Sequence, residues 1–114
     1  MHKRKSVAFP KSIVLLGVRV DDVTFEEALF VIEGFIREGT PHQVVTVNPE
    51  FVMAARRDEE FRRILNAAHL ALPDGIGLIW ASRLLGRPLR ERVAGSDLVP
   101  MIAALAAKRG YRLF

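Results

Sequence analysis

Hydrophobic residues recur along the chain with two periods, one typical of strands and one typical of helices. The apolar, β-rich run 12–20 predicts a strand. Thr24, followed three residues later by Glu27, predicts a capping box and a helix that begins at Phe25. The apolar side chains of this helix recur at helical spacing on one face, and Gly39 is its predicted stop.

A second strand and further helices follow. The β-branched run 43–47 predicts a strand that leads directly into a helix, because Asn48 suits the cap position and Pro49 the first helical position. Asp58 predicts another cap, and the apolar stretch 70–72 predicts another strand.

The remaining residues predict two more helices and the start of a strand. A helical pattern covers 78–84, where Trp80 occupies a core-type position and is expected to pack in the interior. Ser96 predicts the cap of a later helix, in which Met101 is also expected to pack inside. The run 111–114 then predicts a further strand.

Strands and helices therefore alternate. This order predicts an α/β, Rossmann-like fold, in which flanking helices cover a mostly parallel sheet and ligands bind beyond the carboxyl ends of the strands. With 50% hydrophobic and 26% charged residues, we expect a basic tail over residues 1–11 and one domain over residues 12–114. Because the chain ends inside a predicted strand, we expect this domain to be incomplete at its C-terminal end.

Composition excludes several kinds of site and segment. The chain has no cysteine, so a disulfide scaffold, a thiolate metal site and a cysteine nucleophile are excluded. His2, His42 and His69 lack the spacing of metal ligands, and we expect no metal and no cofactor. The apolar run 13–16 is far shorter than a signal-peptide core or a membrane span.

The charge of the chain favours phosphate-bearing partners. Its formal net charge is +4, and arginine outnumbers lysine. A basic module that binds nucleic acid or another partner is therefore one alternative. The arginines are scattered along the chain and form no stripe, so we expect no nucleic-acid partner.

Two segments have the form of a strand, a tight polar turn and a helix. They contain Thr46 and Asn48 in the first turn, and Asp74, Gly75 and Gly77 in the second. In a parallel sheet both turns lie on the same edge, where glycines let backbone amides approach a ligand and a carboxylate can take a proton from a sugar hydroxyl. Asp-Gly is also common in ordinary hairpin turns, but the helical pattern that follows argues against a hairpin.

A nucleotide-binding domain without transferase activity is a second alternative. Gly75 and Gly77 match the start of a dinucleotide-binding fingerprint, and Asp97 lies some twenty residues further on. Trp80 stands where the third glycine would be, and we expect it to crowd the helix against the strand. Arg92, in the loop before the last helix, lies near a helix N-terminus that could hold an anion.

Four ordered motifs resemble those of a known family, the WecG/TagA/CpsF glycosyltransferases of bacterial cell-surface polysaccharide and teichoic-acid synthesis. The likeness runs from about Ile13 to the end of the chain. It comprises the segments VNPEFV, ALPDGIG, GRPL and ERVAGSDL, at residues 47–52, 71–77, 86–89 and 91–98.

The resemblance implies an inverting, metal-independent transferase. It would move an N-acetylmannosamine-type sugar, or a related hexose, from a UDP donor to a polyprenyl-diphosphate-linked sugar, such as one on undecaprenyl diphosphate. The enzyme would be cytoplasmic and peripheral at the inner face of the cell membrane, and its self-association stays open.

The resemblance also implies roles for residues of this chain. Asp74 would be the catalytic base that deprotonates the acceptor hydroxyl, and Thr46 and Asn48 would line the same pocket. Arg92 and Asp97 would belong to a nearby loop, without a defined role.

Members of the family continue with further strands and helices, including a Gly-x-Pro-x-Gln-Glu segment and an arginine-bearing, membrane-facing C-terminal part. The resemblance therefore implies that this chain is the N-terminal portion of the family's domain. Because a metal-independent transferase needs fixed donors or arginines to neutralise the leaving diphosphate, we expect this portion alone to be poorly active or inactive.

Overall fold

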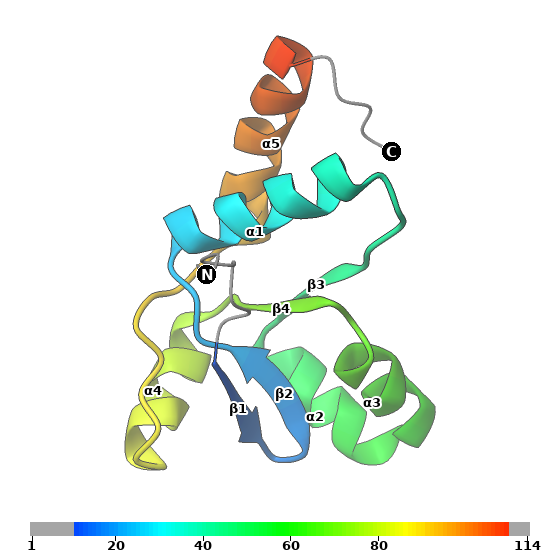
Figure 1. Ribbon diagram of the computed structural model, residues 1–114. Coiled ribbons are helices and arrows are strands. Elements are labelled where there is room, and N and C mark those ends of the chain that lie inside the picture. Colours follow the sequence, from blue (N-terminus) through cyan, green and yellow to red (C-terminus); the bar gives the residue numbers. More distant parts are fainter. Residues whose placement is uncertain (1–10, 110–114) are drawn as a thin grey trace, which may run out of the picture.

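A computed structural model describes residues 11–109, which fold into a layered α/β arrangement (Figure 1). Two pairs of strands and the helices alternate broadly as the sequence predicts. The elements are β1 (Ser12–Leu15), β2 (Val18–Asp21), α1 (Phe25–Glu38), β3 (Val44–Val47), α2 (Pro49–Arg57), α3 (Glu59–Asn66), β4 (Leu70–Pro73), α4 (Ile76–Leu84) and α5 (Gly95–Arg109). The predicted strand at 111–114 and nearly all of the predicted basic tail lie outside the described residues.

The first predicted strand is in fact a hairpin. Strands β1 and β2 pair antiparallel, with Ser12 opposite Asp21 and Leu15 opposite Val18. Between them, Leu16 and Gly17 have φ angles of 51° and 87°, which reverse the chain. Two consecutive positive φ angles are typical of a tight hairpin turn, and Gly17 adopts its angle without a steric penalty. The prediction of a single strand over 12–20 is therefore wrong, because this apolar run contains a turn at Leu16 and Gly17.

Strands β3 and β4 are parallel, and α2 and α3 form the crossover between them. Their register places Val44 opposite Leu70 and Val47 opposite Pro73. Because the two strands run in the same direction and end at the same level, the turns that follow them lie at the same edge of the sheet. This confirms the predicted α/β architecture, with one parallel pair and one antiparallel hairpin among the described strands.

On the edge of β4 that faces away from β3, backbone groups form hydrogen bonds with residues outside this sheet. The backbone N–H of Ala71 donates to Oδ2 of Asp21 at 2.8 Å, in the protein interior. Pro73 has no N–H, and its carbonyl oxygen accepts a hydrogen bond of 2.8 Å from the N–H of Val93. A proline in a buried strand would usually remove a ladder hydrogen bond. Here the proline nitrogen faces an edge at which none of the strands within residues 11–109 pairs with β4.

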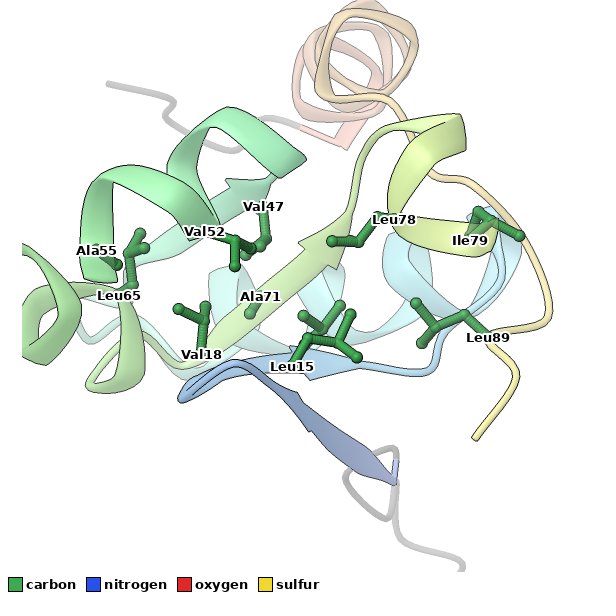
Figure 2. Packing of buried hydrophobic residues seen from close by; sticks show 11 residues of the cluster. Leu15, Val18, Val47, Val52, Ala55, Leu65, Ala71, Leu78, Ile79 and Leu89 are labelled. Atoms are coloured by element: carbon green, nitrogen blue, oxygen red, sulfur yellow. The ribbon is translucent and has the colours of Figure 1, made fainter. Parts of the chain in front are cut away.

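Helices cover both faces of the parallel pair. On one face, Val47 and Ala71 pack with α2, α3, α4 and the hairpin, as the cluster in Figure 2 shows. On the other face, Leu70 and Leu72 pack against α1 and α5. All four residues of β4 are therefore buried, which explains why this strand is a continuous apolar run and shows no alternation.

Most helix boundaries follow the predicted local signals. Thr24 and Glu27 form the capping box of α1, and Gly39 ends that helix with a φ of 77°. Asn48 and Asp58 cap α2 and α3. The predicted cap at Ser96 is wrong by two residues, because α5 begins at Gly95 and Ala94 therefore occupies the cap position.

Two apolar side chains that were expected to pack inside are exposed. Trp80 on α4 is 64% exposed and Met101 on α5 is 49% exposed. The buried face of α4 is formed by Leu78, Ile79 and Ser82. In a short helix whose apolar residues are spread around more than one face, as in α4, periodicity alone does not identify the face that packs.

We expect replacement of Asp21 by alanine to lower the free energy of unfolding by about 1–3 kcal/mol, because the buried N–H of Ala71 loses its acceptor. Urea denaturation would measure the loss. Ser12→Ala is the matched control, since it removes a single donor to the same carboxylate and should cost about 1 kcal/mol or less. Equal losses in the two variants would contradict this role of Asp21.

Candidate active site at the ends of β3 and β4

Asp74 lies directly after β4 and is held there by the neighbouring strand. Its backbone N–H donates to the carbonyl oxygen of Val47 at 2.9 Å. Its carboxylate Oδ2 accepts a long hydrogen bond of 3.4 Å from the N–H of Gly95, and Oδ1 lies 3.7 Å from Nε of Arg92. The side chain is 24% exposed. An ionised carboxylate offers about four lone-pair sites, and the side chains and backbone of residues 11–109 occupy few of them through these two long contacts.

Three glycines allow neighbouring segments to approach the turn that follows β3. A Cβ atom at Gly75 would lie 2.9 Å from Cδ of Pro49, and one at Gly77 would lie 3.1 Å from Cγ of the same proline. A Cβ atom at Gly95 would lie 2.8 Å from Cγ2 of Thr46. Since real side chains rarely tolerate such distances, glycine at these positions is what brings the three segments together.

The N-termini of three helices meet at this turn. Helix α2 begins after Asn48, whose Oδ1 accepts a hydrogen bond of 2.8 Å from the N–H of Phe51. Gly75, the residue before α4, lies against Asn48, and Gly95, the first residue of α5, lies against Thr46 and bonds Asp74. Each helix N-terminus carries a partial positive charge. Partial positive charge from these helix ends is therefore concentrated next to the carboxylate of Asp74.

The loop before α5 brings Arg92 to this site. The loop is tied to the end of β4 by the bond from Val93 to Pro73, and Val93 and Ala94 are buried. Arg92 itself is half exposed, and its guanidinium faces Asp74. The predicted site residues Thr46, Asn48, Gly75, Gly77 and Arg92 thus gather around Asp74.

Asp97 is the predicted site residue that does not join this group. It lies exposed on the first turn of α5, and its N–H donates to the carbonyl oxygen of Ala94 at 3.0 Å. Within residues 11–109, its side chain makes no hydrogen bond or ion pair. An acidic side chain in a first helical turn is favoured by the helix dipole, which accounts for Asp97 structurally.

The structure does not provide the setting that the dinucleotide fingerprint requires. The acidic residue that binds a ribose follows the second strand of a βαβ unit, whereas Asp97 lies on a helix. Trp80, which was expected to crowd α4 against β4, points to solvent instead.

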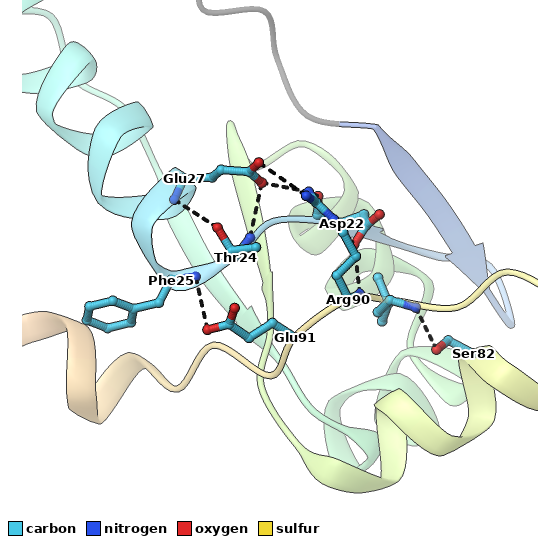
Figure 3. A network of polar contacts seen from close by, with 8 residues as sticks. Asp22, Thr24, Phe25, Glu27, Ser82, Arg90 and Glu91 are labelled. Carbon is cyan, nitrogen blue, oxygen red and sulfur yellow. Dashed lines mark hydrogen bonds and ion pairs between the residues drawn. The ribbon is translucent and has the colours of Figure 1, made fainter.

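Sequence reasoning did not identify the residues that hold the loop carrying Arg92. Figure 3 shows Arg90 bonded to Asp22 and Glu27, and Glu91 bonded to the N–H of Phe25. Arg90 and Asp22 are 68 positions apart, so no local pattern connects them. The sequence predicts Glu27 as the partner of Thr24 in the capping box, but it does not predict the bond from Arg90 to Glu27.

The described residues show neither a metal-binding cluster nor a membrane-spanning helix. In the part of the chain from residue 11 to residue 109, no three histidine, aspartate or glutamate side chains are arranged to hold a metal ion. None of the helices there is long and apolar enough to cross a membrane.

Comparison with known proteins bears on this site directly. The model of a family described as the glycosyl transferase WecG/TagA/CpsF family matches residues 13–114. The chain belongs to this family. The match covers both strand-ending turns, the loop with Arg92 and the start of α5, so the WecG/TagA/CpsF resemblance expected from four motifs is confirmed.

Similar WecG/TagA/CpsF-type proteins occur in several bacteria. One from Bacillus spizizenii, named N-acetylglucosaminyldiphosphoundecaprenol N-acetyl-beta-D-mannosaminyltransferase, is 38% identical over 71 residues, which make up 62% of this chain and 28% of that protein. A Staphylococcus aureus protein of the same name is 28% identical over 102 residues, or 88% of this chain and 40% of that protein. The chain thus spans less than half the length of these curated relatives.

In this WecG/TagA/CpsF chain, we expect Gly95→Ala to lower the free energy of unfolding by about 1–3 kcal/mol, because its Cβ would overpack against Thr46. Thr46→Ser removes Cγ2, and the double variant should recover part of that loss. Thermal or urea denaturation of the two single variants and the double variant would measure the coupling.

Gly34→Ala is the control for that experiment. Gly34 lies inside α1 with open space where a Cβ would be, so the substitution should stabilise the helix by up to about 1 kcal/mol. If Gly95→Ala were as well tolerated as Gly34→Ala, the close approach to Thr46 would not constrain the site.

The ion pair between Glu27 and Arg90 predicts a pH dependence. The hydrogen bond from Arg90 holds the pKa of Glu27 below its ordinary value of 4.5, and the same bond raises the pKa of Arg90. Because the pKa of Glu27 is lower in the folded state, its contribution to stability is present above about pH 4.5 and is lost as the pH falls below that.

We therefore expect the melting temperature of the wild type to fall more steeply between about pH 5 and about pH 3 than that of Glu27→Gln. Glu26→Gln, which changes the neighbouring exposed acid, should keep the wild-type slope. Both side chains of the ion pair are about half exposed, so the difference should be small and should shrink at high salt. Identical slopes in wild type and Glu27→Gln would contradict the assignment.

Proposed function

We propose that this protein transfers an N-acetylmannosamine-type sugar, or a related hexose, from a UDP-sugar to a polyprenyl-diphosphate-linked sugar, and that Asp74 is the general base. The observation that carries the proposal is the position of Asp74. Its carboxylate lies at the end of β4, is partly exposed, and among residues 11–109 makes only long contacts, with Gly95 and Arg92. A carboxylate with free lone pairs at the ligand-binding edge of an α/β sheet suits proton abstraction.

In the proposed reaction, Asp74 accepts the proton of the acceptor hydroxyl. The acceptor oxygen attacks the anomeric carbon of the donor sugar, and a new carbon–oxygen bond forms. The bond from that carbon to the diphosphate of UDP breaks, and UDP leaves with its bonding electrons. Attack opposite to the leaving group inverts the configuration at the anomeric carbon.

The leaving diphosphate gains negative charge during this step and needs positive groups nearby. The converging N-termini of α2, α4 and α5, together with the guanidinium of Arg92, would supply fixed positive charge without a metal. Thr46 and Asn48 would line the same pocket. The relatives extend well beyond the matched segment, and we expect further diphosphate contacts to come from the region that this segment does not cover.

The proposed acceptor also implies a location. A polyprenyl-diphosphate is embedded in a bilayer by its hydrocarbon chain. The protein would therefore be peripheral at the cytoplasmic face of the membrane, where its site can reach the acceptor sugar. The names of the relatives specify an acceptor of this kind, N-acetylglucosamine linked through a diphosphate to undecaprenol. The donor would be soluble and would enter from the cytoplasm.

We expect Asp74→Asn to reduce sugar transfer by about 10²–10⁴-fold, because the amide is a far weaker base but has nearly the same shape. The assay would use a version of the protein extended to the length of the relatives. It would follow release of UDP from UDP-N-acetylmannosamine in the presence of N-acetylglucosaminyl-diphospho-undecaprenol. Glu50→Gln is the matched control, because it removes an exposed acid from the first turn of α2 and should leave turnover unchanged.

Two results would contradict the proposal. Full turnover by Asp74→Asn would eliminate Asp74 as the base. Failure of a wild-type version extended to the length of the relatives to transfer the sugar would eliminate the activity itself. A thermal melt of Asp74→Asn close to that of the wild type would show that lost transfer does not reflect unfolding.

A further inference from the structure

Hydrogen bonds hold the segment between α4 and α5 along most of its length. The N–H of Leu89 donates to Oγ of Ser82 at 3.0 Å, in the interior. The N–H of Val93 bonds Pro73, and that of Gly95 bonds Asp74. Arg92 lies between these fixed points, so its orientation depends on how the segment is held.

Arg90 makes the largest number of these contacts. Its N–H donates to Oδ1 of Asp22 at 3.0 Å, and its guanidinium reaches Oδ1 of the same residue at 3.3 Å and its carbonyl oxygen at 2.7 Å. The guanidinium also donates to both carboxylate oxygens of Glu27, at 3.2 and 2.6 Å. As Figure 3 shows, Arg90 thereby joins the loop to the capping box of α1.

The type of contact matters more than its contribution to stability. The side chains of Arg90 and Glu27 are 50% and 47% exposed, and exposed ion pairs contribute little to the free energy of unfolding. Two parallel bonds from a planar guanidinium to a carboxylate nevertheless fix a direction, which one ammonium group cannot do. The network is therefore better suited to orienting the loop than to stabilising the domain.

The same segment provides a comparison residue. Arg87 precedes Arg90 by three positions, and its backbone N–H bonds Ser82. Its side chain makes no hydrogen bond or ion pair with any residue from 11 to 109. A change at Arg87 removes the same charge from the same segment without touching the contacts to α1.

We propose that Arg90 is a positioning residue, which holds the loop against the N-terminus of α1 so that Arg92 and the N–H of Gly95 face Asp74. The role in catalysis rests on the proposed function of Asp74, whereas the structural role does not. Arg90 acts through the loop, because its contacts within residues 11–109 are with Asp22 and Glu27 and include none with Asp74.

Amide hydrogen exchange tests the structural role without any substrate. In Arg90→Gln, the amide of Val93 should exchange about 5-fold faster than in the wild type, the factor expected for a local loss of about 1 kcal/mol. The amide of Ala71, bonded to Asp21, is the internal reference and should be unchanged. Arg87→Gln should leave both amides unchanged.

Steady-state kinetics test the role in transfer. Arg90→Gln should lower kcat by about 10- to 100-fold with little change in KM, because Arg92 and the N–H of Gly95 would lose their alignment with Asp74, which matters mainly in the transition state. The loss of kcat in Arg90→Lys should be smaller but still present, since lysine keeps the charge but lacks the two parallel N–H donors of the guanidinium. Arg87→Gln should retain wild-type kcat.

The outcomes distinguish this proposal from the proposed function. An unchanged rate of amide exchange at Val93 in Arg90→Gln would overturn the structural role of Arg90, whatever the kinetics show. Faster exchange with unchanged kcat, in a protein that Asp74→Asn inactivates, would overturn the positioning role and leave the base assignment intact. Equal acceleration at Val93 and Ala71 would show global destabilisation and would also overturn the proposal. Full activity of Asp74→Asn would instead reject the proposed function. Amide hydrogen exchange alone would then decide the structural role of Arg90.

Discussion

The outer edge of β4 is the constraint on which the rest of the structure depends. Among the described strands β4 is paired with β3 alone, and the polar backbone groups on its other edge must find partners. Here the carboxylate of Asp21 accepts from Ala71, Pro73 has no N–H to satisfy, and Val93 donates to the carbonyl of Pro73. The first contact fixes the hairpin beside β4, and the second fixes the loop that carries Arg92.

Close packing at the end of the sheet then determines the geometry around Asp74. Gly75 and Gly77 let the start of α4 lie against Pro49, and Gly95 lets the start of α5 lie against Thr46. The glycines that sequence motifs associate with ligand binding therefore also have an internal structural role. Both roles require a small residue, so a motif alone does not separate them.

Local signals made much of this predictable. Caps at Thr24, Asn48 and Asp58 depend on residues a few positions apart, and the parallel pairing placed Thr46 and Asp74 at one edge. The rest depends on contacts between distant residues. No local pattern shows that Arg90 meets Asp22 or that Asp21 meets Ala71, and the apolar composition of α4 concealed which face packs. The turn at Leu16 was missed because only Gly17 marks it.

The bond between Asp21 and Ala71 joins residues 50 positions apart, and this separation has a consequence for how the domain folds. The β1–β2 hairpin can form early, because its strands are adjacent in the chain. The carboxylate of Asp21 meets its partner only after the crossover through α2 and α3 has closed, and closing long loops before their contacts form is slow. We therefore expect the edge of β4, and with it the loop carrying Arg92, to be among the last parts of the molecule to become ordered.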